Sequence, residues 1–182
     1  KGQDSQTKIM IDLQDSFTGA TRNITLHEQV AGSQGHIQTK ERTLKINIPK
    51  GIKAGQKIRL QKQGEAGFAG GPNGDLYIEV GFSPTPLYSV EGADVTTELA
   101  ISPWQAALGD KIKLPTPTGI IDLTLPKLTS SGSKMRLKGR GLPGKVAGDF
   151  FVKLKITLPK SLTEEEQALY QQLKEIEGKI KC

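Results

Sequence analysis

Hydrophobic and polar residues alternate along several short segments of the chain. β-branched residues are frequent in these segments, which are residues 8–13, 22–27, 43–48, 56–61, 99–101 and 120–125. Such alternation predicts strands with one face in the core and the other in solvent. Residues 15–18 and 103–108 each end at a glycine and are expected to form a single helical turn. The pattern therefore predicts a mostly β fold.

The chain contains an internal repeat. Residues 43–50 (TLKINIPK) return as residues 120–127 (IIDLTLPK), and glycines follow each copy at corresponding positions. Each copy closes with a Gly-Asp step and an apolar strand. The spacing between the copies is too long for a solenoid and suits two small homologous β-domains.

Two prolines close together predict where the first domain ends. Pro84 and Pro86 favour an extended connector. We therefore expect the first domain to span residues 1–86 and the second to span residues 87–160, and we name these segments the first repeat and the second repeat.

Only residues 161–182 carry the pattern of a helix longer than a single turn. Thr163 with Glu166 three positions later forms a capping box, as does Ser161 with Glu164. One apolar stripe follows at spacings of 4, 3 and 4 and consists of Leu169, Leu173, Ile176 and Ile180. Such a stripe has to be covered, either by the same chain or by a second chain.

Composition narrows the class of protein further. With 21 glycines and 10 prolines, the chain has too many turn residues for a helical bundle. The single cysteine, Cys182, excludes a disulfide or a cysteine-based zinc site within one chain and fits a reducing compartment. No apolar run approaches the roughly 18 residues that cross a bilayer, so no membrane segment is expected. The net charge of +6 is spread along the chain without a basic tail.

Catalytic chemistry has little support in the sequence. The two histidines, His27 and His36, lie in or beside a predicted hairpin and lack the spacing of a zinc site or a catalytic triad. Residues 139–144 match G-x-G-x-x-G but precede a strand rather than a helix, so a phosphate loop is not expected. Asp75 and Asp149 recur in both repeats, which favours a structural role in a turn. We expect no enzyme, no metal and no cofactor.

Two binding surfaces remain as candidates. Aliphatic residues on one face of the opening strands, beside a free strand edge, can receive an extended peptide by strand addition, although the same residues also suit a core. A second candidate is a basic face, on which four cations alternate with Met135 and Leu137: Lys134, Arg136, Lys138 and Arg140. These cations predict salt-dependent contact with DNA phosphates, without aromatic residues for base stacking.

Five motifs in the same order resemble the C-terminal substrate-binding region of DnaJ-type heat-shock co-chaperones. They are residues 44–51 (LKINIPKG), 58–64 (IRLQKQG), 70–76 (GGPNGDL), 102–109 (SPWQAALG) and 137–143 (LKGRGLP). The cysteine repeats of the zinc-bearing class have no counterpart between Leu26 and Thr43, so the chain resembles the class without a zinc module. Within that class it is most similar to bacterial members named for binding curved DNA. The His-Pro-Asp signature of the J-domain is absent.

The resemblance implies two β-sandwich-like domains and a C-terminal helix that forms a homodimer. It implies a fragment that captures non-native polypeptide for transfer to a DnaK-type heat-shock chaperone in the cytoplasm, without stimulating its ATPase. The alternatives are a nucleoid-associated DNA-binding module and a purely structural module for self-association. The client groove that the resemblance implies contains Ile9, Ile24, Leu26, Leu44 and Tyr88, with a basic rim of Lys8 and Arg22. We hypothesise that Leu169, Leu173 and Ile176 of the apolar stripe supply the dimer contact.

Overall fold

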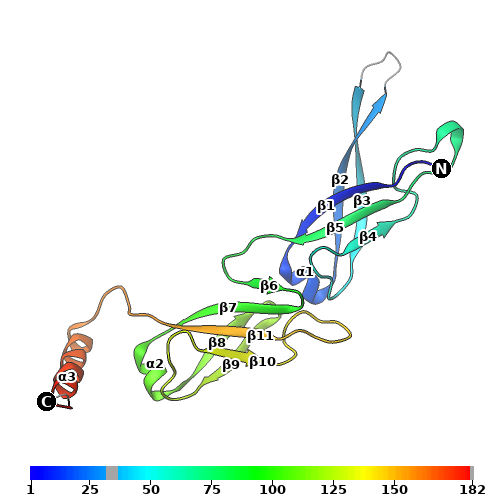
Figure 1. The fold of residues 1–182 in the computed structure, drawn as a ribbon. Helices are drawn as coiled ribbons and strands as arrows, with labels where there is room; N and C mark the ends of the chain where they lie inside the picture. Colours follow the sequence, from blue (N-terminus) through cyan, green and yellow to red (C-terminus); the bar gives the residue numbers. More distant parts are fainter. Residues whose placement is uncertain (32–36, 181–182) are drawn as a thin grey trace.

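The computed structural model describes residues 1–31 and 37–180 and confirms a mostly β chain that ends in a helix (Figure 1). The elements of the first repeat are β1 (Ser5–Ile11), α1 (Leu13–Thr18), β2 (Ala20–Ala31), β3 (Ile37–Ile48), β4 (Lys57–Leu60), the 3-10 turn η1 (Phe68–Gly70) and β5 (Leu76–Phe82). The elements that follow are β6 (Ser89–Glu91), β7 (Asp94–Ile101), α2 (Pro103–Leu108), β8 (Asp110–Thr116), β9 (Gly119–Leu125), β10 (Lys134–Leu137), β11 (Phe150–Ile156) and α3 (Glu164–Ile180). None of the described helices is long and apolar enough to cross a membrane.

Both repeats have the same topology. In the first repeat, β1 pairs in parallel with β5, which pairs antiparallel with β4. In the second repeat, β7, β11 and β10 are arranged in the same way. Each repeat adds a hairpin, β2–β3 in the first and β8–β9 in the second. The matching sheets confirm the internal repeat that the sequence predicts.

The pairing of the strands shows that the repeat also includes the segment that precedes residues 43–50 and 120–127. Ser5 lies opposite Leu76 on β5, and Val95 lies opposite Phe150 on β11. Because these pairs occupy the same place in the two sheets, Ser5 corresponds to Val95, and β1 as a whole corresponds to β7. The same alignment relates α1 to α2 and β2 to β8.

The second sheet has one strand more than the first. There, β6 pairs antiparallel with β7 after a tight turn at Gly92, whose φ is 62°. Within the described residues, β1 pairs with β5 alone and forms the edge of its sheet. The edge of β1 therefore remains open where the corresponding edge of β7 is covered.

Two core clusters lie in the molecule, and the boundary between them is not the boundary between the repeats. Ile46, Ile48 and Ile78 belong to the first cluster, which the first repeat supplies. The second cluster is centred on β7 and β11 but includes Leu13 and Phe17 of α1. Figure 1 shows α1 at the junction, beside the second sheet. The first repeat thus contributes a helix to the core of the second.

Two predicted boundaries differ from the observed ones. The strand predicted over residues 8–13 ends at Ile11, because Leu13 begins α1 and is buried in the second core cluster. The helix predicted within residues 161–182 begins at Glu164, directly after Thr163. Thr163 and Glu166, inside the helix, exchange the predicted capping-box hydrogen bonds of 2.8 and 3.2 Å. His36 and Cys182 lie outside the described residues.

Candidate functional site

Four of the predicted client-binding residues form one half-buried apolar strip. Ile9 on β1, Ile24 and Leu26 on β2 and Leu44 on β3 pack against the first core cluster and keep part of their surface exposed. Ile24 and Leu44 lie directly opposite each other in the hairpin. We refer to these four residues as the apolar strip. The strip spans β1 and the β2–β3 hairpin, beside the open edge of β1.

Tyr88 lies apart from the apolar strip. Its ring packs edge-on against Phe150 in the second core cluster, with the ring centroids 6.1 Å apart. Its hydroxyl donates a 3.3 Å hydrogen bond to the carbonyl oxygen of Pro115, and burial raises its pKa. Tyr88 also borders a cavity of about 630 Å³ between α1 and the β8–β9 turn. The structure therefore places Tyr88 in the second repeat rather than beside Ile24.

Of the two residues predicted to form a basic rim, Lys8 points away from the apolar strip, whereas Arg22 lies on the same face of β2 as Ile24. Lys8 alternates with Ile9 along β1 and therefore points to the opposite face of the sheet, where its Nζ lies 4.0 Å from Glu79. Arg22 is held by Asp15, with Nε and Nη2 donating hydrogen bonds of 3.0 and 2.8 Å to the carboxylate. These hydrogen bonds raise the Arg22 pKa.

The four predicted DNA-contacting cations do not share one strand face, contrary to the sequence prediction. Strand β10 ends at Leu137, and Gly139 turns the chain with a φ of 70°, so Lys138 and Arg140 lie beyond the strand. Arg136 is paired with Asp149, to which its Nε donates a 2.6 Å hydrogen bond. Lys134 alone of the four lies on the strand without this pairing.

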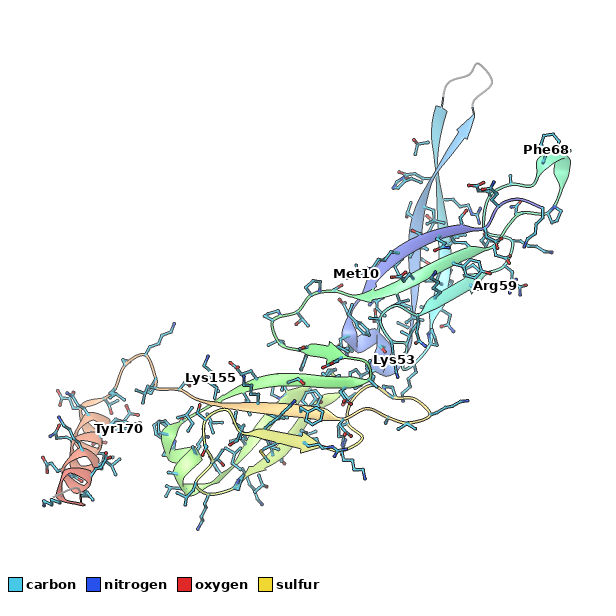
Figure 2. The ribbon with its side chains drawn as sticks, viewed as in Figure 1. Met10, Lys53, Arg59, Phe68, Lys155 and Tyr170 are labelled. Atoms are coloured by element: carbon cyan, nitrogen blue, oxygen red, sulfur yellow. The ribbon has the colours of Figure 1, made fainter. Side chains whose placement is uncertain are left out.

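A basic face nevertheless exists, and most of it comes from a strand that the sequence analysis did not consider. Lys153 on β11 lies opposite Lys134, and Lys155 follows two residues later on the same face. Phe151, also on this face, lies under the Lys134 Nζ, which is 4.3 Å from the ring centroid. We refer to Lys134, Phe151, Lys153 and Lys155 as the basic outer face; Figure 2 labels Lys155. The alternating pattern of residues 150–156 was the signal that could have revealed it.

The two Gly-Asp steps form the same structural clamp in both repeats, as the sequence predicts. Asp75 accepts hydrogen bonds from the Lys62 backbone N–H at 2.8 Å and from Arg59 Nη2 at 2.7 Å. Asp149 accepts the corresponding bonds from the Gly139 N–H at 2.8 Å and from Arg136. In each repeat the backbone bond and then the arginine lower the pKa of the aspartate.

This clamp predicts a specific acid sensitivity. Because the Asp149 pKa is lower in the folded state, ionised Asp149 stabilises the fold above about pH 4, and this contribution is lost as the pH falls through the folded pKa. We expect the melting temperature of Asp149→Asn to fall less than that of the wild type between pH 5 and pH 2.5 in thermal unfolding. Asp122→Asn, at a side chain that is 75% exposed, serves as the control and should follow the wild type. Parallel curves for Asp149→Asn and the wild type would contradict the clamp.

A second apolar surface lies between α2 and α3. Trp104 and Leu108 on α2 face Leu169, Leu173 and Ile176 on α3 across a cavity of about 630 Å³. Each of these five side chains is between 45% and 69% exposed. Figure 2 shows Tyr170 on the side of α3 that faces α2, and its buried hydroxyl has no hydrogen-bond partner among the described residues. The three predicted dimer residues therefore lie on one surface, together with Trp104, which the sequence analysis did not single out.

Tandem β repeats, an apolar strip beside an open strand edge and a terminal helix with an exposed apolar face are features of a binding module. Residues 5–159 match the family model described as DnaJ C terminal domain. The chain belongs to the DnaJ C-terminal domain family, a family of chaperone domains that are in general not enzymes.

Relatives named Curved DNA-binding protein match nearly the whole chain. The protein from Coxiella burnetii (strain RSA 493 / Nine Mile phase I) is 47% identical over 176 residues, which cover 96% of this chain. Those from Pseudomonas syringae pv. tomato and Escherichia coli (strain SMS-3-5 / SECEC) are 36% and 39% identical over 95% of this chain. The chain spans 56–57% of the length of these three relatives.

Proposed function

We propose that this chain captures extended, non-native polypeptide on the apolar strip of its first repeat. The observation that carries the proposal is that Ile9, Ile24, Leu26 and Leu44 stay half-exposed beside the open edge of β1. An extended peptide there gains backbone hydrogen bonds from a strand edge and apolar contacts from the strip. The family membership supports transfer of the captured client to a DnaK-type chaperone in the cytoplasm.

The chemistry of this strip suits weak and permissive binding. Each square ångström of apolar client surface that is buried contributes about 25 cal/mol, from which the cost of ordering a flexible chain is subtracted. The balance corresponds to micromolar affinity with a loose sequence preference. Such affinity allows clients to be released, and no catalytic group is needed.

The direct test is fluorescence anisotropy of a labelled, extended hydrophobic peptide at low and moderate salt. We expect binding that changes little with salt and weakens at least about tenfold in Ile24→Asp, because a carboxylate in an apolar contact has to be desolvated. Ile120→Asp provides the matched control, since Ile120 lies on β9 with 69% of its surface exposed. Equal loss in both variants would show that the strip is not the binding site.

DNA binding is the second candidate function, and the basic outer face favours it. Lys153 and Lys155 lie two residues apart on an exposed strand face, and Lys134 lies opposite Lys153. Lys155 also forms a 3.5 Å ion pair with Glu98 on β7. Contacts of these cations with phosphates would weaken steeply as salt rises. The titration separates the two functions when duplex DNA is the competitor, because peptide binding to the apolar strip is unaffected by DNA. DNA binding at low salt without any peptide binding would support the second function, with nucleoid association.

We also propose that the surface between α2 and α3 binds a second copy of the chain. Comparison of the two repeats supports this proposal. The second repeat buries Leu13 and Phe17 of α1. Their counterparts on α2 are Pro103 and Ala107. The corresponding face of α2 instead borders the α2–α3 cavity, next to the exposed Leu173. A dimer would cover both apolar faces, and two apolar strips in one dimer would add avidity for a single client.

Leu173→Asp is expected to convert the dimer to a monomer, because it places a charge in the centre of the proposed interface. Sedimentation velocity over a range of protein concentrations measures this change. Val146→Asp, at a loop position that is 85% exposed and not on this surface, should remain dimeric. A dimeric Leu173→Asp variant would mean that α3 docks on its own chain only.

A further inference from the structure

The second repeat binds a segment of its own chain at a place that the first repeat leaves open. This segment, residues 87–91, includes β6, which pairs with β7. Its side chains Tyr88 and Val90 both pack against the second core cluster. Figure 1 shows β6 along the outer edge of β7.

Contacts on both sides hold this segment. On one side, the Thr97 Oγ1 of β7 donates a 2.8 Å hydrogen bond to the Leu87 carbonyl oxygen. On the other side, the Tyr88 hydroxyl donates to the Pro115 carbonyl oxygen of β8 at 3.3 Å. Since β8 corresponds to β2, the segment lies in the place that corresponds to the space between β1 and β2.

The first repeat has no described counterpart of the 87–91 segment, and the side chains at the corresponding place are more exposed. Val95, which lies opposite Val90, and Thr97, which donates a hydrogen bond to the Leu87 carbonyl oxygen, are 0% and 8% exposed. The corresponding residues of β1, Ser5 and Thr7, are only half-buried.

Two further observations extend the comparison. Leu114 of β8 is 1% exposed, and Ile24, its counterpart in the repeat, is half-buried and belongs to the apolar strip. The Ser5 N–H donates to the Asp75 carbonyl oxygen on the β5 side, so alternation directs the Gln6 N–H to the open edge. The first repeat therefore has a partly exposed apolar floor and an unpaired strand edge, where the second repeat has Tyr88 and Val90.

We propose that the first repeat selects client segments in which an aromatic and a β-branched residue lie two positions apart, as Tyr88 and Val90 do. This inference rests on the proposed capture of polypeptide and adds the pattern that is captured. Residues two apart on an extended chain point to the same side, so both side chains reach the floor while the residue between them faces solvent. Val90 lies opposite Val95, so the same register places the β-branched client residue opposite Ser5. Continuing that register by two residues places the aromatic client residue opposite Thr7. Ser5 and Thr7 are both small, which leaves room beside β1 for the larger client side chains.

The test compares labelled peptides of one composition, based on residues 86–92 (PLYSVEG), by fluorescence anisotropy. One peptide keeps tyrosine and valine two positions apart, and its isomer (PLSYVEG) places them next to each other, so that they point to opposite sides. We expect the isomer to bind about tenfold more weakly, a difference that corresponds to about 1.4 kcal/mol.

A pair of protein variants locates the site. Thr7→Trp fills the space opposite the aromatic client residue and should abolish binding of the spaced peptide. Gln6→Trp places the same side chain on the other face of β1 and should leave binding intact. A photoreactive benzoylphenylalanine in place of the peptide tyrosine should crosslink to the wild-type first repeat, which keeps the test decisive if Thr7→Trp does not fold.

Failure of the pattern and failure of the proposed function give different results. Equal affinity of the two isomers, with binding still lost in Ile24→Asp, would overturn the pattern and leave polypeptide capture in place. Crosslinking to the second repeat alone would also overturn it. No binding of either isomer or of a reduced, carboxymethylated unfolded protein would overturn both.

Discussion

Replacing Phe17 with alanine is expected to lower the free energy of unfolding by about 3–5 kcal/mol, the usual cost of deleting a buried phenylalanine ring. Phe17 belongs to the first repeat but packs, 6% exposed, into the core cluster of the second. The cavity would therefore open between the two repeats and weaken both. Urea unfolding followed by tryptophan fluorescence measures this, because the single tryptophan, Trp104, lies in the second repeat.

The position of Trp104 makes this experiment a test of coupling between the repeats. A lower midpoint of the Trp104 transition in Phe17→Ala means that a first-repeat side chain stabilises the second repeat. Phe68→Ala is the matched control: Phe68 stands at the tip of the β4–β5 loop (Figure 2), is 95% exposed and should leave the midpoint unchanged. If far-ultraviolet circular dichroism shows an earlier transition in Phe17→Ala while the Trp104 transition stays in place, the repeats unfold independently.

A close backbone contact reinforces the same junction. A Cβ added to Gly51 would lie 2.0 Å from the Pro143 carbonyl oxygen, and the φ of Gly51 is 81°. Gly51 follows β3 in the first repeat, and Pro143 belongs to the β10–β11 loop of the second. Together with Phe17, this contact favours a junction of fixed geometry between the apolar strip and the α2–α3 surface.

The elements that the sequence predicts correctly depend on local signals. Alternation identified β3 and β9, glycines marked the ends of α1 and α2, and the capping box at Thr163 marked the start of α3. Each signal comes from neighbouring residues and is decided by backbone geometry or by one buried face.

What the sequence did not reveal depends on non-local contacts. The parallel pairing of β1 with β5 joins segments at opposite ends of the first repeat, such as Ser5 and Leu76, and the burial of Phe17 depends on the other repeat. The basic outer face was missed for the same reason, since Lys134 and Phe151 meet across two strands. Alternation gives the side of a strand on which a residue lies, whereas strand order decides which residues share a surface.

The candidate client-binding residues show the same difference between local signals and non-local contacts. Ile9, Ile24, Leu26 and Leu44 come together because strand alternation and the hairpin register place them on one face. Tyr88 does not join them, because the segment after the connector is bound to the second sheet. The way in which this segment pairs with β7 is the basis for the client pattern that we propose for the first repeat.

Gly148→Ala is expected to destabilise the second repeat by about 3 kcal/mol, at the upper end of the usual cost of overpacking. A Cβ at Gly148 would lie 1.9 Å from the carbonyl oxygen of Ala93, in the segment that leads into β7. The Ala93 carbonyl oxygen cannot move aside at low cost, because it accepts a 2.8 Å hydrogen bond from the Leu142 N–H. Thermal unfolding followed by Trp104 fluorescence measures the loss.

Gly144→Ala is the matched control for this steric argument, since it makes the same chemical change in the same loop. Its Cβ would meet only the Val146 carbonyl oxygen, at an ordinary 3.5 Å, so we expect a melting temperature close to that of the wild type. Equal melting temperatures for the two variants would show that the loop yields to the methyl group. A selective loss in Gly148→Ala would establish why a glycine precedes the aspartate in both repeats, because Gly74 makes the same approach to Gln3 at 2.0 Å.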